Sequence, residues 1–182
     1  DLGCNMSGIS NSDLEKVYSI AKSQAVLGLV ANSILSDSFL AAKLPYQTAT
    51  RLRYFVMNNL STSQILNNTL LAIVRELRKH DIDPVLLKGQ GIAKYYLIPE
   101  LRQCGDIDIY VGQEKFAKAC EVIGAMSTLE EHQGDIPSLK HFHTRIGHAF
   151  IEIHRYTDVY WPRRYNRIYQ KISDTGMNSD LV

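Results

Sequence analysis

The sequence predicts an α+β protein, with an N-terminal helical bundle followed by a small mixed β-sheet. Three observations support this class. Apolar residues recur at helical spacing through the first 80 residues. After Asp81, short apolar runs alternate with amphipathic stretches, which is the pattern of a mixed sheet with helices. Hydrophobic residues make up 45% of the 182 residues, which is enough for a packed core.

The N-terminal region contains two long helical patterns. Ser12 and Glu15 fit a capping box, and the apolar spacing after them predicts a helix over about 13–36. A second pattern runs from about Tyr46 to Lys79, and an interruption near 61–63 stays open. We therefore expect two long helices before the sheet begins.

The second half of the chain predicts the strands and helices of a sheet domain. The expected strands are Pro84–Leu87, Asp106–Val111, His141–Ile146 and Ala149–Arg155. The expected helices are Gly89–Leu97, Gln113–Ile123 with Gly124 at its C′ position, and Arg164–Ile172. The expected domains are a helical region over 1–80, a sheet-containing core over 81–160, and a tail or the start of a further helical part over 161–182.

The composition restricts the class of partner. Lys and Arg number 20 against 19 Asp and Glu, a net charge of +1, which argues against nucleic acid because its binders carry a clustered basic surplus. Three cysteines without a C-x-x-C pair predict free thiols in a reducing cytoplasm. No apolar run approaches the ~20 residues that span a bilayer, so we expect a cytoplasmic protein with no membrane partner.

The segment with the strongest chemical signal is Gly105–Val111, with the sequence G-D-I-D-I-Y-V. Alternate side chains of a strand share a face, so Asp106 and Asp108 point one way and the isoleucines the other. Two adjacent carboxylates repel each other unless a cation lies between them. Mg²⁺ suits such a pair because it binds a few carboxylate oxygens and keeps positions for water and phosphate. A lone D-x-D pair also caps turns or lies solvated at a sheet edge, so it does not decide the matter alone.

Two further segments favour a cation and a phosphate. Lys88–Gly91 follows an expected strand and opens a helix, where glycine lets the backbone approach a phosphate and the first amides are free to bind it. The alternative is that these glycines serve the turn alone. Glu152 lies among apolar residues in an expected strand, where a charge needs a partner. A cation shared with the two aspartates would supply one, and a salt bridge to an arginine is the alternative.

The histidines give a weaker signal. Five of the six lie between 132 and 154, and His141 and His143 share one strand face, a pattern that could bind zinc. No further Cys/His pair at finger-like spacing supports zinc, so ordinary surface or hydrogen-bonded histidines are the favoured interpretation. His154 shares a face with Glu152, which suits a role near the metal as well as a core or rim position.

Together these motifs resemble a known family. The order of strand, glycine turn, short helix, D-x-D strand and later carboxylate strand resembles the DNA polymerase β-like nucleotidyltransferase superfamily. More closely, L-L-K-G at 86–89, R-x-x-G-D-I-D at 102–108 and I-E-I-H at 151–154 look like the bacterial uncharacterised nucleotidyltransferase family. The likeness spans about 12–160 and implies a small mixed sheet of polymerase β-like type over 81–160.

The resemblance implies a metal-dependent transfer of a nucleoside monophosphate, AMP from ATP, to an acceptor hydroxyl on a small molecule or a protein. The implied cofactor is Mg²⁺, with Mn²⁺ as an alternative. The implied catalytic and metal-binding residues are Asp106, Asp108 and Glu152, with Glu152 also able to take the hydroxyl proton. The implied nucleotide-binding residues are Lys88, Gly89, Gln90 and Arg102, and Arg102 alternatively braces the carboxylate strand.

One departure from the superfamily pattern keeps a second function open. In the superfamily, the turn that contacts phosphate usually has Gly followed by Gly or Ser, whereas in this chain Gly89 is followed by Gln90. The alternative is a non-catalytic nucleotide- or metal-binding member that acts as an interaction or regulatory module. A third interpretation is a helical interaction protein whose acidic strand binds a structural cation.

Overall fold

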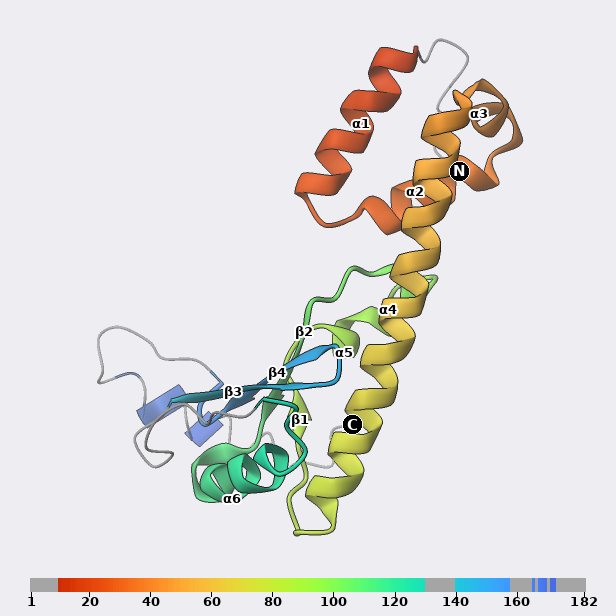
Figure 1. Ribbon diagram of the computed structural model, residues 1–182. Helices are drawn as coiled ribbons and strands as arrows, with labels where there is room; N and C mark the ends of the chain where they lie inside the picture. Colours follow the sequence, from red (N-terminus) through yellow and green to blue (C-terminus); the bar gives the residue numbers. More distant parts are fainter. Residues whose placement is uncertain (1–9, 130–139, 158–164, 166, 170, 173–182) are drawn as a thin grey trace. The chain divides into compact units, whose positions relative to one another are not determined.

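A computed structural model describes residues 10–129, 140–157, 165, 167–169 and 171–172. Helices and a four-stranded mixed sheet make up these residues (Figure 1), which confirms the predicted combination of helices and mixed sheet. The chain divides into two compact units, 1–64 with 93–103 and 65–92 with 104–182. The domain boundaries near 80 and 160 stay predictions.

The first unit begins with two helices where the sequence predicted one over 13–36. The chain forms α1 (Asn11–Ser23) and α2 (Leu27–Ser36), because Ala25 between them adopts a left-handed φ of 54° that no helix continues through. The predicted capping box is also wrong by two residues. Ser10 Oγ accepts from the amide of Asp13 at 3.2 Å, and Asp13 Oδ2 accepts from the amide of Ser10 at 3.1 Å.

The rest of the first unit consists of α3 (Ser38–Lys43), the start of α4 (Tyr46–Arg78) and the 3₁₀ helix η2 (Pro99–Leu101). A close backbone approach joins α2 to η2, since a Cβ on Gly28 would lie 2.5 Å from the carbonyl oxygen of Leu101. The apolar core of this unit consists of Leu14, Ala21, Leu27, Ala31, Ile34, Leu40 and Leu52.

Helix α4 is the longest element. It runs for 33 residues without the interruption considered near 61–63. Its first part belongs to the first unit and contributes Leu52 to the core there, and its second part contributes Ile73 and Leu77 to the core of the second unit. In the part of the chain that the structure describes, none of the helices combines the length and apolar character that a bilayer crossing requires.

The second unit contains the sheet, whose strand order is β1-β2-β4-β3. Strands β2 and β4 are parallel, and the other two pairs are antiparallel. The strands are β1 (Val85–Leu86), β2 (Asp106–Tyr110), β3 (His141–Ile146) and β4 (Ala149–His154), within two residues of the predicted bounds. Helix α5 (Gln90–Ala93) follows β1, and the 13-residue helix α6 (Gly112–Gly124) follows β2.

The helices of the second unit depart from prediction at their ends. Helix α5 covers four residues rather than the expected Gly89–Leu97. Gly124 is the last residue of α6, and Ala125 in right-handed helical geometry is its C-cap, so the predicted C′ glycine is wrong. The predicted helix over Arg164–Ile172 lies partly outside the described residues, although 167–169 and 171–172 are helical.

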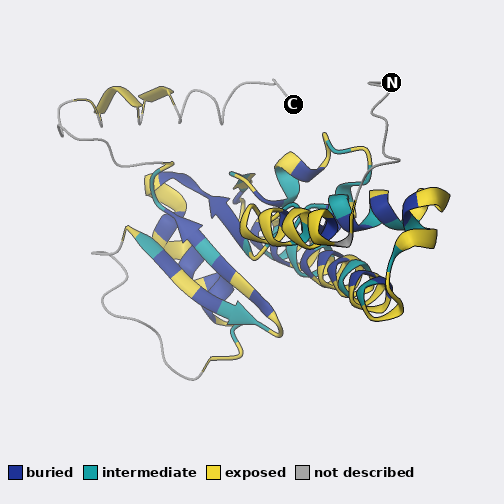
Figure 2. Cartoon of the chain, turned by 90° about the horizontal axis from the view of Figure 1, so that it is seen from above, coloured by how far each residue is buried: buried dark blue, intermediate teal, exposed yellow. Residues whose placement is uncertain are grey.

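The sheet has one apolar face and one polar face. Along β3 and β4 buried residues alternate with more exposed ones (Figure 2), as the two-residue repeat of a strand requires. The apolar face includes side chains that are at most 1% exposed and share a core with α6, among them Ile107, Ile109, Phe142, Ile151 and Ile153. Helix α6 contributes Phe116, Ala119 and Ile123 to this core, among others. The opposite face therefore carries the residues in between, which include the predicted site residues Asp106, Asp108 and Glu152.

Candidate metal centre

The three predicted carboxylates lie together on the polar face of the sheet. Asp106 and Asp108 belong to β2 and Glu152 to β4, and the parallel register places Asp108 directly beside Glu152. One oxygen from each of the three carboxylates lies within 4.8 Å of the other two. This is the spacing of groups that share one cation, so strand pairing brings together what the sequence placed 44 residues apart.

Asp108 is the most buried of the three. Its side chain is 0% exposed, and its Oδ1 lies 3.1 Å from Lys88 Nζ and 3.2 Å from His154 Nε2. Its other oxygen, Oδ2, is buried and has no hydrogen-bond partner among the described residues. A buried acceptor left without a partner costs about 1–3 kcal/mol, so this oxygen is the strongest sign that a further ligand belongs here.

Lys88 provides a positive charge to the two aspartates. Its Nζ lies 3.1 Å from Asp108 Oδ1 and 3.7 Å from Asp106 Oδ2. The hydrogen bond to Asp108 raises the pKa of Lys88, against the opposing effect of desolvation, and the charges of the three carboxylates raise it further. The ammonium therefore stays protonated and partly neutralises the cluster. The predicted contact of Lys88 with nucleotide stays a prediction.

The turn after Lys88 has two distinctive residues. Gly89 adopts a left-handed φ of 59°, and a Cβ there would lie 3.5 Å from the carbonyl oxygen of Asp106. Gln90 buries both its Nε2 and its Oε1, and neither atom has a hydrogen-bond partner among the residues described. Sequence reasoning considered only the backbone N–H of Gln90. The structure draws attention to its carboxamide, which is buried with its hydrogen-bonding capacity unused.

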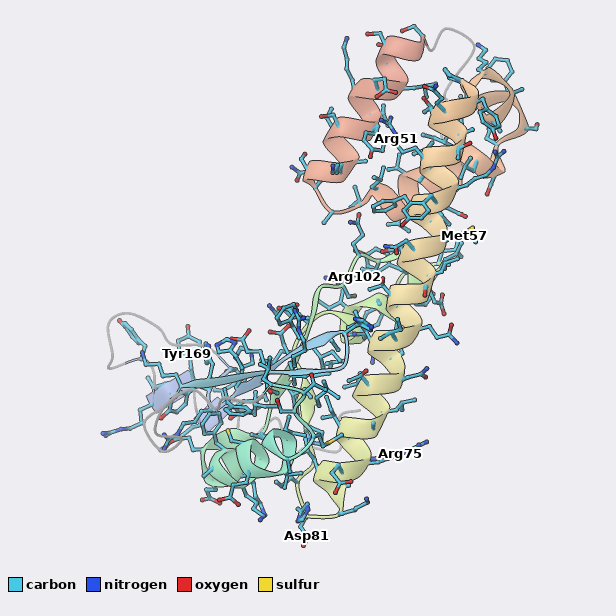
Figure 3. All side chains as sticks on the ribbon, viewed as in Figure 1. Arg51, Met57, Arg75, Asp81, Arg102 and Tyr169 are labelled. Carbon is cyan, nitrogen blue, oxygen red and sulfur yellow. The ribbon has the colours of Figure 1, made fainter. Side chains whose placement is uncertain are left out.

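Arg102 lies in the first unit, at the C-cap of η2 (Figure 3). Its predicted roles, contacting nucleotide or bracing the carboxylate strand, stay predictions. Lys88, Gly89, Gln90 and the three carboxylates all belong to the second unit.

Glu152 has imidazole partners. Its Oε1 lies 2.9 Å from His141 Nδ1 and 3.8 Å from His143 Nε2, and its Oε2 lies 3.7 Å from His154 Nε2. Desolvation and the nearby His154 lower the pKa of His141, and Glu152 opposes them. The sequence favoured ordinary surface or hydrogen-bonded histidines here. The structure places three of them around one carboxylate, a convergence that required the pairing of β3 with β4 to be known.

A hollow of about 390 Å³ opens beside the carboxylates. It is lined by Gly105, Asp106, His143, Thr144, Phe150, Ile151 and Glu152. Phe150 is 52% exposed, and the guanidinium of Arg145 lies 4.0 Å from the centre of its ring. Sequence reasoning missed Phe150, although its position two residues before Glu152 places it on the same strand face.

Fold and site together define an α+β protein with an acidic candidate cation site on the open face of a mixed sheet. Comparison with known families then gives the particular group. The chain belongs to the uncharacterised nucleotidyltransferase family, whose family model matches residues 10–178. No curated protein and no solved structure matches the chain. The family assignment confirms the predicted family, and the bacterial origin and the superfamily stay predictions.

Proposed function

We propose that this protein is a Mg²⁺-dependent nucleotidyltransferase that moves a nucleoside monophosphate, AMP from ATP, to an acceptor hydroxyl. One observation carries the proposal: the carboxylates of Asp106, Asp108 and Glu152 converge within 4.8 Å in a member of a nucleotidyltransferase family. The unpartnered Oδ2 of Asp108 adds an orphaned acceptor at the same place.

The donor set fits a hard divalent cation. Asp106, Asp108 and Glu152 offer only oxygen ligands, which Mg²⁺ prefers, and Mn²⁺ accepts the same set. Their partial exposure, 46% for the Asp106 side chain and 20% for that of Glu152, leaves room for water and phosphate oxygens. Bound Mg²⁺ would neutralise the triphosphate and stabilise the departing pyrophosphate.

The transfer reaction has two parts, the exchange of bonds at the α-phosphorus and the removal of a proton from the acceptor. The acceptor oxygen forms a bond to the α-phosphorus while the bond from that phosphorus to the pyrophosphate oxygen breaks. The proton of the acceptor hydroxyl passes to the carboxylate of Glu152. Because His141 Nδ1 lies 2.9 Å from Glu152 Oε1, this imidazole holds the carboxylate in position for the transfer.

Residues next to the three carboxylates would bind the nucleotide. Lys88 is half exposed, so its ammonium can leave the aspartates and pair with the β- and γ-phosphates when a metal replaces it. Gly89 supplies the close backbone approach, and the carboxamide of Gln90 supplies donors in place of the hydroxyl that the superfamily usually has. The half-exposed ring of Phe150 offers a stacking surface for a base in the adjacent hollow, where the base would join or displace the guanidinium of Arg145.

The acceptor is the least defined part of the proposal. A small hydroxyl compound and a protein side chain both suit a hollow that is open to solvent. We place the reaction in the cytoplasm, because the buried Cys120 keeps a free thiol.

Calorimetry with ATP, CTP, GTP and UTP, with and without Mg²⁺, tests the proposal. We expect one nucleotide to bind in a Mg²⁺-dependent manner, and binding to disappear in the double variant Asp106→Asn/Asp108→Asn. The matched control is Asp83→Asn, because Asp83 is an exposed carboxylate of the same unit that pairs with Arg78 at the surface. A screen of acceptors with the labelled nucleotide follows.

Two results would overturn the proposal. If none of the four nucleotides binds to the wild type, the chain is a non-catalytic member of the family. If binding persists in the double variant, the nucleotide site lies elsewhere.

A further inference from the structure

A row of imidazoles lies next to the carboxylates on the polar face. Strand β3 runs antiparallel to β4, and its register places His143 opposite Glu152 and His141 opposite His154. Residues opposite each other on paired strands share a face. Three imidazoles and one carboxylate therefore occupy neighbouring positions, although His141 and His154 are 13 residues apart in the sequence.

The contacts in this row are close. The rings of His141 and His154 have centroids 4.5 Å apart, and His141 Nδ1 lies 2.9 Å from Glu152 Oε1. His154 Nε2 lies between two carboxylates, 3.2 Å from Asp108 Oδ1 and 3.7 Å from Glu152 Oε2. Ligand atoms of His141, Glu152 and His154 all lie within 4.8 Å of one another.

We propose that His141, Glu152 and His154 form a second cation site, which takes a transition metal ion of the Zn²⁺ class. Two imidazoles and one carboxylate make up a donor set that zinc uses in catalytic sites, where three protein ligands leave one position open. Mg²⁺ does not favour imidazole nitrogen, whereas zinc and its neighbours bind it well. The donor set therefore separates this site from the oxygen-only cluster beside it.

The spacing suits a tetrahedral ion after small movements. Ligand atoms ~2.0–2.2 Å from zinc stand about 3.5 Å apart, so the present separations of up to 4.8 Å close by side-chain rotation. The His141 side chain is 37% exposed, which gives an ion access from solvent. His143 Nε2, 3.8 Å from Glu152 Oε1, is near enough to become a fourth ligand.

Glu152 belongs to both sites. A carboxylate has two oxygens and can bridge two ions, so binding at the imidazole site fixes the orientation of Glu152 toward the aspartates. The zinc site itself stands on the His–Glu–His geometry alone. It does not depend on nucleotide transfer, and it can hold even if the proposed function fails.

Metal binding to the whole chain, stripped of metal by a chelator, tests the proposal at one fixed pH without nucleotide. Zn²⁺ is titrated by calorimetry, and Co²⁺ is used as a visible spectroscopic probe of coordination geometry. The variants are His141→Asn and His154→Gln, with circular dichroism to verify folding. His148→Ala is the matched control, since His148 lies exposed in the turn between β3 and β4. Asp106→Asn removes a ligand of the oxygen-only site and leaves the imidazoles intact.

The expected result is one Zn²⁺ per chain, retained in a large excess of Mg²⁺ and weakened by about 100-fold or more in His141→Asn, since even residues behind the ligands contribute 10–100-fold. Co²⁺ should give the visible bands of a four-coordinate ion. His148→Ala and Asp106→Asn should bind as the wild type does.

Three outcomes would overturn the proposal. Absence of Zn²⁺ binding would mean that the imidazoles only position Glu152. Loss in Asp106→Asn with retention in His141→Asn would assign the ion to the oxygen-only cluster. Equal loss in His148→Ala would indicate nonspecific binding to surface histidines. His141 is partly exposed, so its variant is informative even if the more buried His154→Gln fails to fold.

Discussion

The two faces of the sheet are built from the same strands but differ in chemistry, since one is packed with apolar side chains and the other holds clustered carboxylates. On one face, Ile107 and Ile151 are at most 1% exposed and pack into the core that α6 completes. On the other, Asp106, Asp108 and Glu152 repel one another, and one buried oxygen of Asp108 has no partner within the described structure. Because successive residues point to opposite faces, stability and chemistry are separated by a single position along the strand. Substitutions on the two faces should therefore have separable effects.

The largest expected effect comes from the polar face. Asp108→Asn keeps the size of the side chain and removes a carboxylate ligand, so we expect transfer activity to fall on the order of 10³-fold or more. The fold should persist, because asparagine keeps the shape of the side chain and the half-exposed ammonium of Lys88 that loses its partner can be solvated. Activity measured with labelled nucleotide and thermal unfolding of the same sample check both parts. Loss of the fold together with activity would contradict the separation of the two faces.

The next effect comes from the apolar face. Ile107→Ala leaves a cavity in the core, and we expect the free energy of unfolding to fall by about 2–5 kcal/mol. Urea denaturation measures this loss. At a temperature where the variant is still folded, its Mg²⁺ affinity should stay near that of the wild type. A large change in metal affinity in the folded variant would show that the two faces are coupled.

A matched pair of glycines sharpens the comparison. Gly89 and Gly147 have left-handed φ values of 59° and 57°, so alanine at either should cost roughly 1–2 kcal/mol of stability. Gly147 lies in the turn between β3 and β4 with open space around it, whereas Gly89 approaches the backbone of Asp106. Only Gly89→Ala should also weaken nucleotide binding. Equal nucleotide affinities in two folded variants would remove Gly89 from the site.

The smallest expected effect concerns the ammonium that pairs with the aspartates. Lys88→Met removes a cation that competes with Mg²⁺, and a half-exposed ion pair is worth about 1 kcal/mol or less, so Mg²⁺ should bind up to about fivefold more tightly. Nucleotide binding should weaken at the same time. Lys118→Met, which breaks the exposed pair with Glu121, is the control. Weaker Mg²⁺ binding in Lys88→Met would contradict this role.

The sequence predicted the sheet and its carboxylates well because both follow from a local repeat. The alternation in D-I-D-I placed Asp106 and Asp108 on one face without any knowledge of the fold. Glu152 could be predicted as a site residue because a charge among apolar residues needs a partner. The strand bounds agreed closely for the same reason, since a two-residue repeat that ends before a glycine, as β3 does before Gly147, is a strong signal.

What the sequence did not predict depends on conformations and pairings that leave no local pattern. The break between α1 and α2 occurs at Ala25, a single left-handed residue within an apolar helical repeat. A glycine or proline at this position would have indicated the break in the sequence. The contact between Lys88 and the aspartates needs the antiparallel pairing of β1 with β2. The three imidazoles around Glu152 need the register of β3 on β4, which hydrophobic spacing alone does not give.

The parallel pairing of β2 with β4 has a consequence for the timing of folding. His154 and Asp108, in contact across this pair, are 46 residues apart in the chain. A nascent chain that has emerged only as far as α6 carries both aspartates but not Glu152, so it cannot yet form the cluster. Closing so long a loop makes this contact slow relative to the local helices. The capacity to bind a cation should therefore appear late in refolding, and metal binding would report completion of the sheet.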